Sequence, residues 1–257
     1  MADPVPAEPP APVPGDGAGG MTLIEHLEEL RWRLLKMVIA FAVGGTVAWF
    51  FFDQILSFLT QPLLELPVAT QIISKGKLIF TAPQEAFFIR LKVVSATGLA
   101  LALPVILWQL WRFVTPGLYA HERRYALPFV LVATALFAAG VAVAFSMLPA
   151  TLKVLASFAG TDLVIVPRAS EYLSFLLLLI AAFGLAFELP VVLMGLTLAG
   201  VISTATLRKG RRVAYVVMMV IAAVVTPTPD PINMLLLAVP LILLYEATIL
   251  IARMLKK

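Results

Sequence analysis

Residues 171–200 read EYLSFLLLLIAAFGLAFELPVVLMGLTLAG, thirty residues in which Glu171 and Glu188 are the only charged side chains. A run of this length is too long for a β-strand. The hydrocarbon core of a bilayer, roughly 30 Å thick, needs about 20 helical residues to cross it. The stretch therefore predicts a membrane-spanning helix.

Five further apolar segments lie on both sides of this stretch, at 34–52, 87–110, 126–148, 213–226 and 232–251. Apolar types make up 61% of the 257 residues and charged types 13%, so the chain is more apolar and less charged than ordinary soluble domains. We therefore predict an all-α membrane protein with six transmembrane helices. This composition argues against a soluble enzyme or a nucleic-acid-binding protein.

The last two segments differ from the others. Residues Val213 to Val225 number only 13, which is about 20 Å of helix, and the sixth segment carries Pro240 near its middle. We expect helices five and six to be short, which would thin the bilayer beside them.

Lysine and arginine indicate the orientation. Thirteen of them lie on the side of the N-terminus and six on the other side, which predicts that both termini are cytoplasmic. Two longer external loops then span 53–86 and 149–170. The apolar residues of the first predict a helix that lies on the bundle or in the membrane interface.

Three regions follow from these patterns. Residues 1–20 are rich in proline, alanine and glycine and are expected to be disordered. Residues 21–252 form the membrane domain, which opens on an amphipathic helix with a capping box at Thr22 and Glu25. Residues 253–257 are a short basic cytoplasmic tail.

Two acids lie inside apolar segments, where a charge costs about 2.5–3.5 kcal/mol on insertion scales. Glu188 either is a protonated carboxyl bonded to a backbone carbonyl freed by Pro190, or is a polar contact for another helix or a translocating chain. Glu246 lies near Arg253, and a structural ion pair or a snorkelling contact explains it.

Two further acids, Glu29 and Glu122, belong to otherwise basic cytoplasmic stretches. A surface pair between Glu29 and Arg33, four residues apart on a helix, is one interpretation. Recognition of a cationic ligand is the other.

Motifs for catalysis are missing from the sequence. There is no phosphate-binding glycine loop, no G-x-S-x-G and no H-E-x-x-H, and His26 and His121 are the only histidines. We expect no enzyme activity, metal or cofactor. Small residues in 133–146, together with Gly195 and Gly200, are expected to mediate helix packing.

Several motifs resemble the TatC family, the multi-spanning subunit of the twin-arginine protein translocase. They cover about residues 21–252 in the family's order and spacing, with one added residue in the turn 226–230. The matching stretches are LEELRWR at 27–33, PVILWQLWRFVTPGLYAHERR at 104–124, FELP at 187–190, LRKGRR at 207–212 and LAVPLILLYE at 237–246.

The resemblance implies a receptor that binds the twin-arginine signal peptide of folded precursor proteins at the cytoplasmic face. Guanidinium and carboxylate form a planar two-bond fork that lysine cannot reproduce. By the resemblance, Glu29 and Glu122 bind the arginines, and the residues that support the surface are Arg31, Phe113, Pro116 and Arg124.

The resemblance also implies the partners. Glu188 would meet the single-span subunits TatA and TatB, several copies would form one complex in the bacterial inner membrane, and the proton-motive force would drive export. Two alternatives are a proton-coupled small-solute transporter that uses Glu188 as its relay and a purely structural membrane scaffold.

Overall fold

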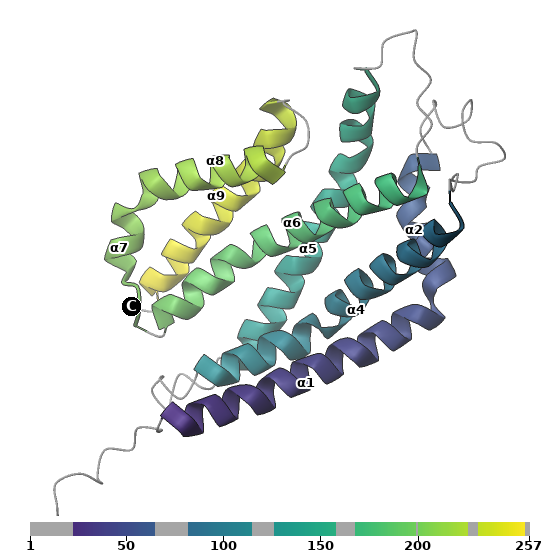
Figure 1. Ribbon diagram of the computed structural model, residues 1–257. Helices are drawn as coiled ribbons and strands as arrows, with labels where there is room; N and C mark the ends of the chain where they lie inside the picture. The colour runs from purple at the N-terminus through teal and green to yellow at the C-terminus, as the bar shows by residue number, and fades with distance from the viewer. Residues whose placement is uncertain are drawn as a thin grey trace, which may run out of the picture.

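The computed structural model describes residues 23–64, 82–114, 126–157, 168–198, 200–225 and 231–254, and every element in them is an α-helix (Figure 1). This confirms the predicted all-α class. The helices are α1 (Leu23–Phe50), α2 (Phe52–Leu64), α4 (Pro83–Val114), α5 (Ala126–Ser157), α6 (Ala169–Leu198), α7 (Thr204–Lys209), α8 (Arg211–Val225) and α9 (Pro231–Met254).

Five of these helices, α1, α4, α5, α6 and α9, are long and apolar enough to cross a membrane. The fifth predicted segment is α8, whose 15 residues span about 22 Å, so the expected short helix is confirmed. The expectation of a short sixth helix is wrong. Helix α9 has 24 residues, because Pro240 does not end it and its last turn continues past the apolar segment.

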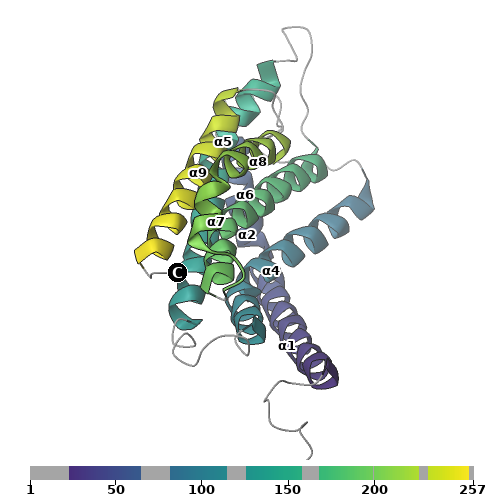
Figure 2. The same ribbon diagram turned by 90° about the vertical axis from the view of Figure 1, so that its left-hand side faces the viewer.

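The long helices run back and forth, so the bundle has two ends (Figures 1 and 2). At one end, which we call the terminal end, α1 and α5 begin and α4, α6 and α9 finish. At the other, the α2 end, α2 lies beside the first turns of α4 and α6. The first and last described residues, Leu23 and Met254, are both at the terminal end.

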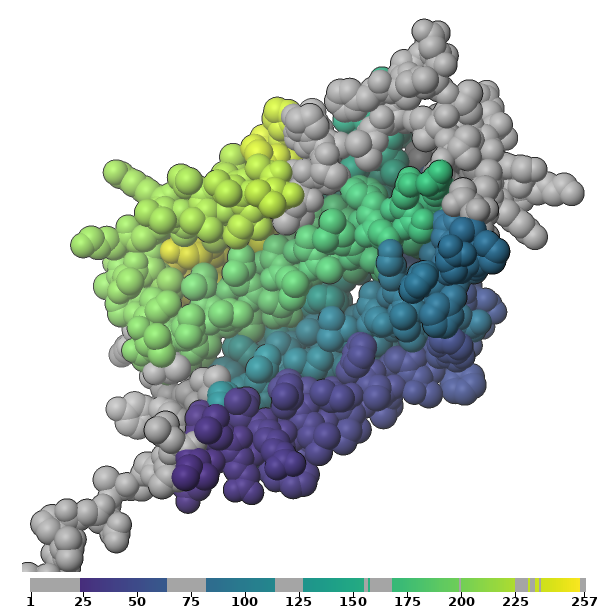
Figure 3. Space-filling view, viewed as in Figure 1, coloured from purple at the N-terminus to yellow at the C-terminus, as the bar shows by residue number. Residues whose placement is uncertain are grey.

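Helix α6 is the central helix. It packs against α4, α5, α8 and α9, and half of the residues in its most apolar stretch are buried. Leu173, Leu176 and Phe183 are almost completely covered. Helix α1, in contrast, lies along one edge of the molecule (Figure 3), and only about a sixth of the residues in its apolar stretch are buried. Its exposed apolar side chains are suited to lipid.

Small residues bring the helices together, as expected. A Cβ on Gly98 of α4 would lie 2.7 Å from the backbone of Gly45 of α1, and one on Gly140 of α5 would lie 2.6 Å from the Phe183 carbonyl oxygen of α6. Gly195 faces the Phe129 ring. Gly200 is a correction: it has open space around it and a φ of +72°, so its role is the turn after α6.

Helix α2 confirms the expected helix on the bundle within residues 53–86. Its Leu59 and Leu63 are buried, and the Tyr172 hydroxyl of α6 donates to the Leu59 carbonyl oxygen at 2.8 Å. Helix α2 therefore closes the α2 end over the first turns of α6.

Candidate functional site

The candidate site begins where the first turn of α1 meets the last turn of α4, at the terminal end. The His26 ring of α1 stacks on the Phe113 ring of α4, with centroids 4.4 Å apart and an interplanar angle of 23°. This contact places the two sequence motifs LEELRWR and WRF side by side. It also gives Phe113, one of the expected site residues, a defined neighbour.

Glu29 lies one helical turn after His26. Its Oε1 accepts a hydrogen bond from Arg33 Nε at 3.0 Å and a second one from Arg33 Nη2. The structure therefore confirms the predicted pair between Glu29 and Arg33. The side chains of Glu29 and Arg33 are 20% and 11% exposed, so this pair is better shielded than an ordinary surface pair.

The second oxygen of Glu29 is different. Oε2 is covered and has no hydrogen-bond partner among the described residues. A carboxylate can accept a two-bond fork from a guanidinium, and Arg33 engages one oxygen only. Glu29 therefore keeps an unused acceptor beside the His26–Phe113 stack. Arg31 is exposed and makes no ion pair with Glu29, so its supporting role stays a prediction.

The other expected members of this surface, Pro116, Glu122 and Arg124, lie outside the described residues. The helix ends on either side, Val114 of α4 and Ala126 of α5, are both at the terminal end.

Glu188 lies in the middle of α6 and is 7% exposed. Neither of its carboxylate oxygens has a hydrogen-bond partner among the described residues. The bond to a carbonyl freed by Pro190, one of the two interpretations from sequence, is therefore absent there. The carbonyl that Pro190 frees is that of Ala186, four residues earlier; the carbonyl of Pro190 itself accepts from the Thr248 hydroxyl of α9 at 3.5 Å. An unpartnered buried carboxyl is costly, so Glu188 is a candidate contact for another chain.

Glu246 does not form the ion pair that the sequence suggested with Arg253. Its partner is Arg211 of α8, at 2.6 Å, and it also accepts a hydrogen bond from the Tyr215 hydroxyl. Arg253 is two helical turns away, about 10 Å along the axis. Sequence reasoning missed Arg211 and Tyr215, although a signal existed. Arg211 and Glu246 are almost equally far from the turn at 226–230, so antiparallel packing of α8 and α9 brings them level.

The structure thus separates the polar residues into three places. The turn of α1 that carries His26 and Glu29 meets Phe113 of α4 through the His26 ring, Glu188 has no hydrogen-bond partner among the described residues, and Glu246 joins α9 to α8. No group of three or more His, Asp or Glu side chains in the described part of the chain could hold a metal ion.

Comparison with known proteins matches residues 25–240 to the family model described as Sec-independent protein translocase protein (TatC). A protein of this name from Frankia casuarinae is 42% identical over 237 residues, which are 90% of this chain and 65% of the relative. One from Magnetococcus marinus is 43% identical over 232 residues, 90% of this chain and 83% of the relative.

A solved structure has the same fold. The crystal structure of a twin-arginine translocase receptor, TatC, in DDM superposes with a TM-score of 0.73 and 39% sequence identity. The match covers 89% of this chain and 99% of that one.

Proposed function

The chain belongs to the TatC family of the Sec-independent, twin-arginine protein translocase, and we propose that it is the subunit that binds twin-arginine signal peptides at the cytoplasmic face. The family is a translocase subunit and not an enzyme, in agreement with the motifs missing from the sequence. Family membership sets aside the small-solute transporter and the structural scaffold.

The unused Oε2 of Glu29 is the observation that carries this proposal. Arg33 neutralises part of the charge and holds the carboxylate in place, while Oε2, although covered, has no hydrogen-bond partner among the described residues. A peptide guanidinium can donate a hydrogen bond to Oε2, the remaining acceptor. Such charge-assisted bonds are roughly twice as strong as neutral ones. The His26–Phe113 stack offers an apolar wall beside it.

Glu122 supplies the second carboxylate in this proposal, and Arg31, Pro116 and Arg124 shape the surface around the two acids. The support is that residues 115–125 join two helix ends at the same end of the bundle as Glu29. Two acids on two chain segments can select two adjacent arginines, whereas a single exposed pair would discriminate weakly.

The topology proposed is six spans with both termini in the cytoplasm of a bacterial inner membrane. The lysine and arginine distribution supports the orientation. Helix α8, the fifth span in chain order, brings the five longer helices to six, and its length of about 22 Å is less than a hydrocarbon core of roughly 30 Å. A bilayer thinned beside α8 would lower the barrier to passing a folded protein.

The partners proposed are single-span subunits of the TatA and TatB type, with several copies of this chain in a complex driven by the proton-motive force. The unpartnered carboxyl of Glu188 supports this part of the proposal, because a polar group on an entering helix would satisfy it.

Photo-crosslinking in membrane vesicles tests the proposed receptor site. A precursor that carries Arg-Arg, and its Lys-Lys twin, would be presented to probes beside Glu29 and Glu122. We expect a crosslink with Arg-Arg that falls at least about tenfold with Lys-Lys, and by a similar factor in Glu29→Gln, as expected for loss of a charge-assisted bond.

Glu28→Gln is the matched control, because Glu28 is an exposed acid on the same helical turn. Its crosslinking should equal that of the parent protein. Equal crosslinking of Arg-Arg and Lys-Lys precursors would show that the two acids are ordinary surface charges.

A further inference from the structure

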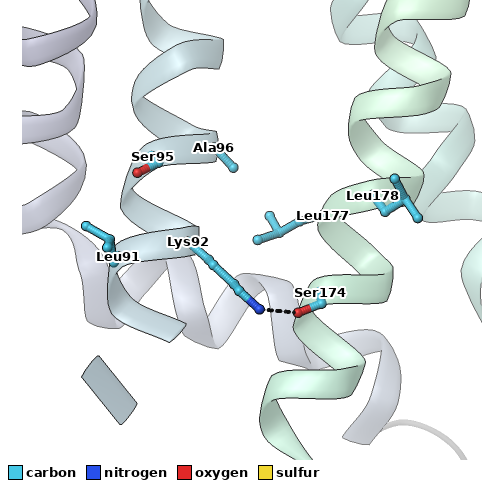
Figure 4. Close-up of a pocket in the computed structure, with 7 residues that line it drawn as sticks. All are labelled: Leu91, Lys92, Ser95, Ala96, Ser174, Leu177 and Leu178. Atoms are coloured by element: carbon cyan, nitrogen blue, oxygen red, sulfur yellow. Dashed lines mark hydrogen bonds between the residues drawn. The ribbon is translucent and has the colours of Figure 1, made fainter. Parts of the chain in front are cut away.

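A groove of about 540 Å³ lies between α4 and α6 near the α2 end, far from the candidate peptide site (Figure 4). The residues that line it are Leu91, Lys92, Ser95, Ala96, Ser174, Leu177 and Leu178. The Lys92 ammonium donates to the Ser174 hydroxyl oxygen across the groove at 2.8 Å. We infer that this groove binds an anionic phospholipid, with its phosphate on Lys92 and Ser174 and one acyl chain along the leucines.

The first argument is charge. Lys92 forms no ion pair within the described residues, and Ser174 takes only one of its three ammonium donors. The nearest acid along α6, Glu171, pairs instead with Arg168 at 3.6 Å. A positive charge with free donors therefore faces the groove and complements a phosphate.

The neighbouring cation does not share this role. The guanidinium of Arg90 lies over the rings of Trp49 and Phe52, at 4.4 and 4.7 Å from their centroids. Arg90 therefore contributes to the packing of α4 against the end of α1 and the start of α2. Lys92 is left as the group that can meet a ligand.

The second argument is depth in the membrane. Residues 93–111 of α4 carry no charge, and the helix rises about 30 Å over the 20 steps from Lys92 to Arg112, the thickness of a hydrocarbon core. Lys92 and Arg112 therefore mark the two boundaries of the membrane along this helix. Lys92 lies at the level of the phospholipid head groups.

The third argument is the order of polar and apolar residues along the groove. Helices α4 and α6 both run from the α2 end into the membrane, so Ala96 and Leu177 lie one turn deeper than Lys92 and Ser174 (Figure 4). Leu178 is 69% exposed, so the groove is open sideways to lipid. Apart from Ser95, the deeper lining is apolar. A polar mouth next to a mainly apolar channel fits a phospholipid, whereas a free anion would make no favourable contact with the channel.

The test uses the full-length protein in nanodiscs of phosphatidylcholine that contain a small fraction of photoactivatable phosphatidylglycerol. Labelled peptides from α4 and α6 would be quantified by mass spectrometry. We expect Lys92→Gln to lower labelling of these peptides about fivefold, the preference that one interfacial cation confers, while Lys92→Arg keeps most of it.

Lys153→Gln is the matched control, because Lys153 is an exposed lysine near the end of α5, at the same end of the bundle. It should leave labelling unchanged. Equal labelling in Lys92→Gln and the parent, or equal losses in Lys92→Gln and Lys153→Gln, would overturn the proposal.

Two further arms complete the test. Ala96→Leu fills the channel without changing charge and should lower labelling as well, and unchanged labelling would rule out the acyl-chain contact. Excess free glycerol phosphate should not displace the lipid, and displacement would identify a soluble anion as the ligand instead. An unfolding midpoint of Lys92→Gln equal to that of the parent excludes misfolding as the cause of a loss.

Discussion

Three glutamates at different depths illustrate how the surroundings of a carboxylate set its role. Glu246 has both oxygens occupied, by Arg211 and by the Tyr215 hydroxyl. Glu29 has one oxygen occupied and one unused, and Glu188 has neither occupied among the described residues. A glutamate with both oxygens hydrogen-bonded is a structural link. A glutamate with an oxygen that lacks a partner is a candidate binding group, because a ligand or another chain can donate to that oxygen.

The link between Arg211 and Glu246 can be measured by a double-mutant cycle. Both side chains are more than a third exposed, so the coupling expected from Arg211→Gln and Glu246→Gln is small, about 0.5–1 kcal/mol of the free energy of unfolding. Thermal unfolding of the purified protein would provide the values. Arg253→Gln combined with Glu246→Gln is the control and should show no coupling; a coupling as large as that of Arg211 would restore Arg253 as the partner.

Among the helices, the pair α1 and α4 positions the candidate site. Helix α1 packs mainly on α4, so the place of Glu29 relative to Phe113 depends on this single helix contact. The contact is close because Gly45 and Gly98 face each other without side chains. A glycine pair at membrane depth thereby influences the geometry at the terminal end.

Gly98→Ala tests this dependence. The new Cβ would lie 2.7 Å from Gly45 backbone atoms, which cannot turn away as a side chain can, so the helices must separate. We expect a loss of about 1–3 kcal/mol in the free energy of unfolding, typical of overpacking, and weaker crosslinking of the Arg-Arg precursor.

Gly195→Ala serves as the comparison, since its Cβ would meet side chains and no backbone, the Phe129 ring at 3.4 Å and the Trp111 ring at 3.8 Å. Thermal unfolding should then be almost unchanged. Similar unfolding midpoints for the Gly98 and Gly195 variants would show that the α1–α4 contact can accommodate an added methyl group.

At the scale of the whole molecule, the described residues include a buried acid, Glu188, that has no hydrogen-bond partner among them. Glu188 lies in the central helix, where a charge or an unpaired carboxyl is unfavourable. Functional groups of this kind commonly lower the stability of the isolated protein and become satisfied only in its complexes.

Glu188→Met separates these two effects. We expect the free energy of unfolding of the isolated protein to stay constant or rise by up to about 2 kcal/mol, because an unsatisfied polar group is removed. Co-purification with the single-span subunits should decrease. Glu171→Gln, an exposed acid on the same helix, should change neither quantity. Lower stability with normal co-purification would mean that Glu188 has a structural partner within the chain.

One contact of the candidate site was accessible from sequence for a local reason. The pairing of Glu29 with Arg33 follows from a spacing of four residues on one helix. The stack of His26 on Phe113 could not be predicted in this way, because the two residues are far apart in the chain and meet through the crossing of α1 and α4. The motif resemblance predicted Phe113 as a site residue but did not predict its contact with His26.

The all-α class, the short α8 and the continuity of the first amphipathic turn with α1 followed from composition and periodicity. They could be predicted because lipid requires each segment to satisfy its own backbone hydrogen bonds, which is a local condition. The partner of Glu246, the contact of Lys92 with Ser174 and the isolation of Glu188 emerged only from helix packing. These contacts depend on the register and crossing of helices distant in sequence, and local pattern contains neither.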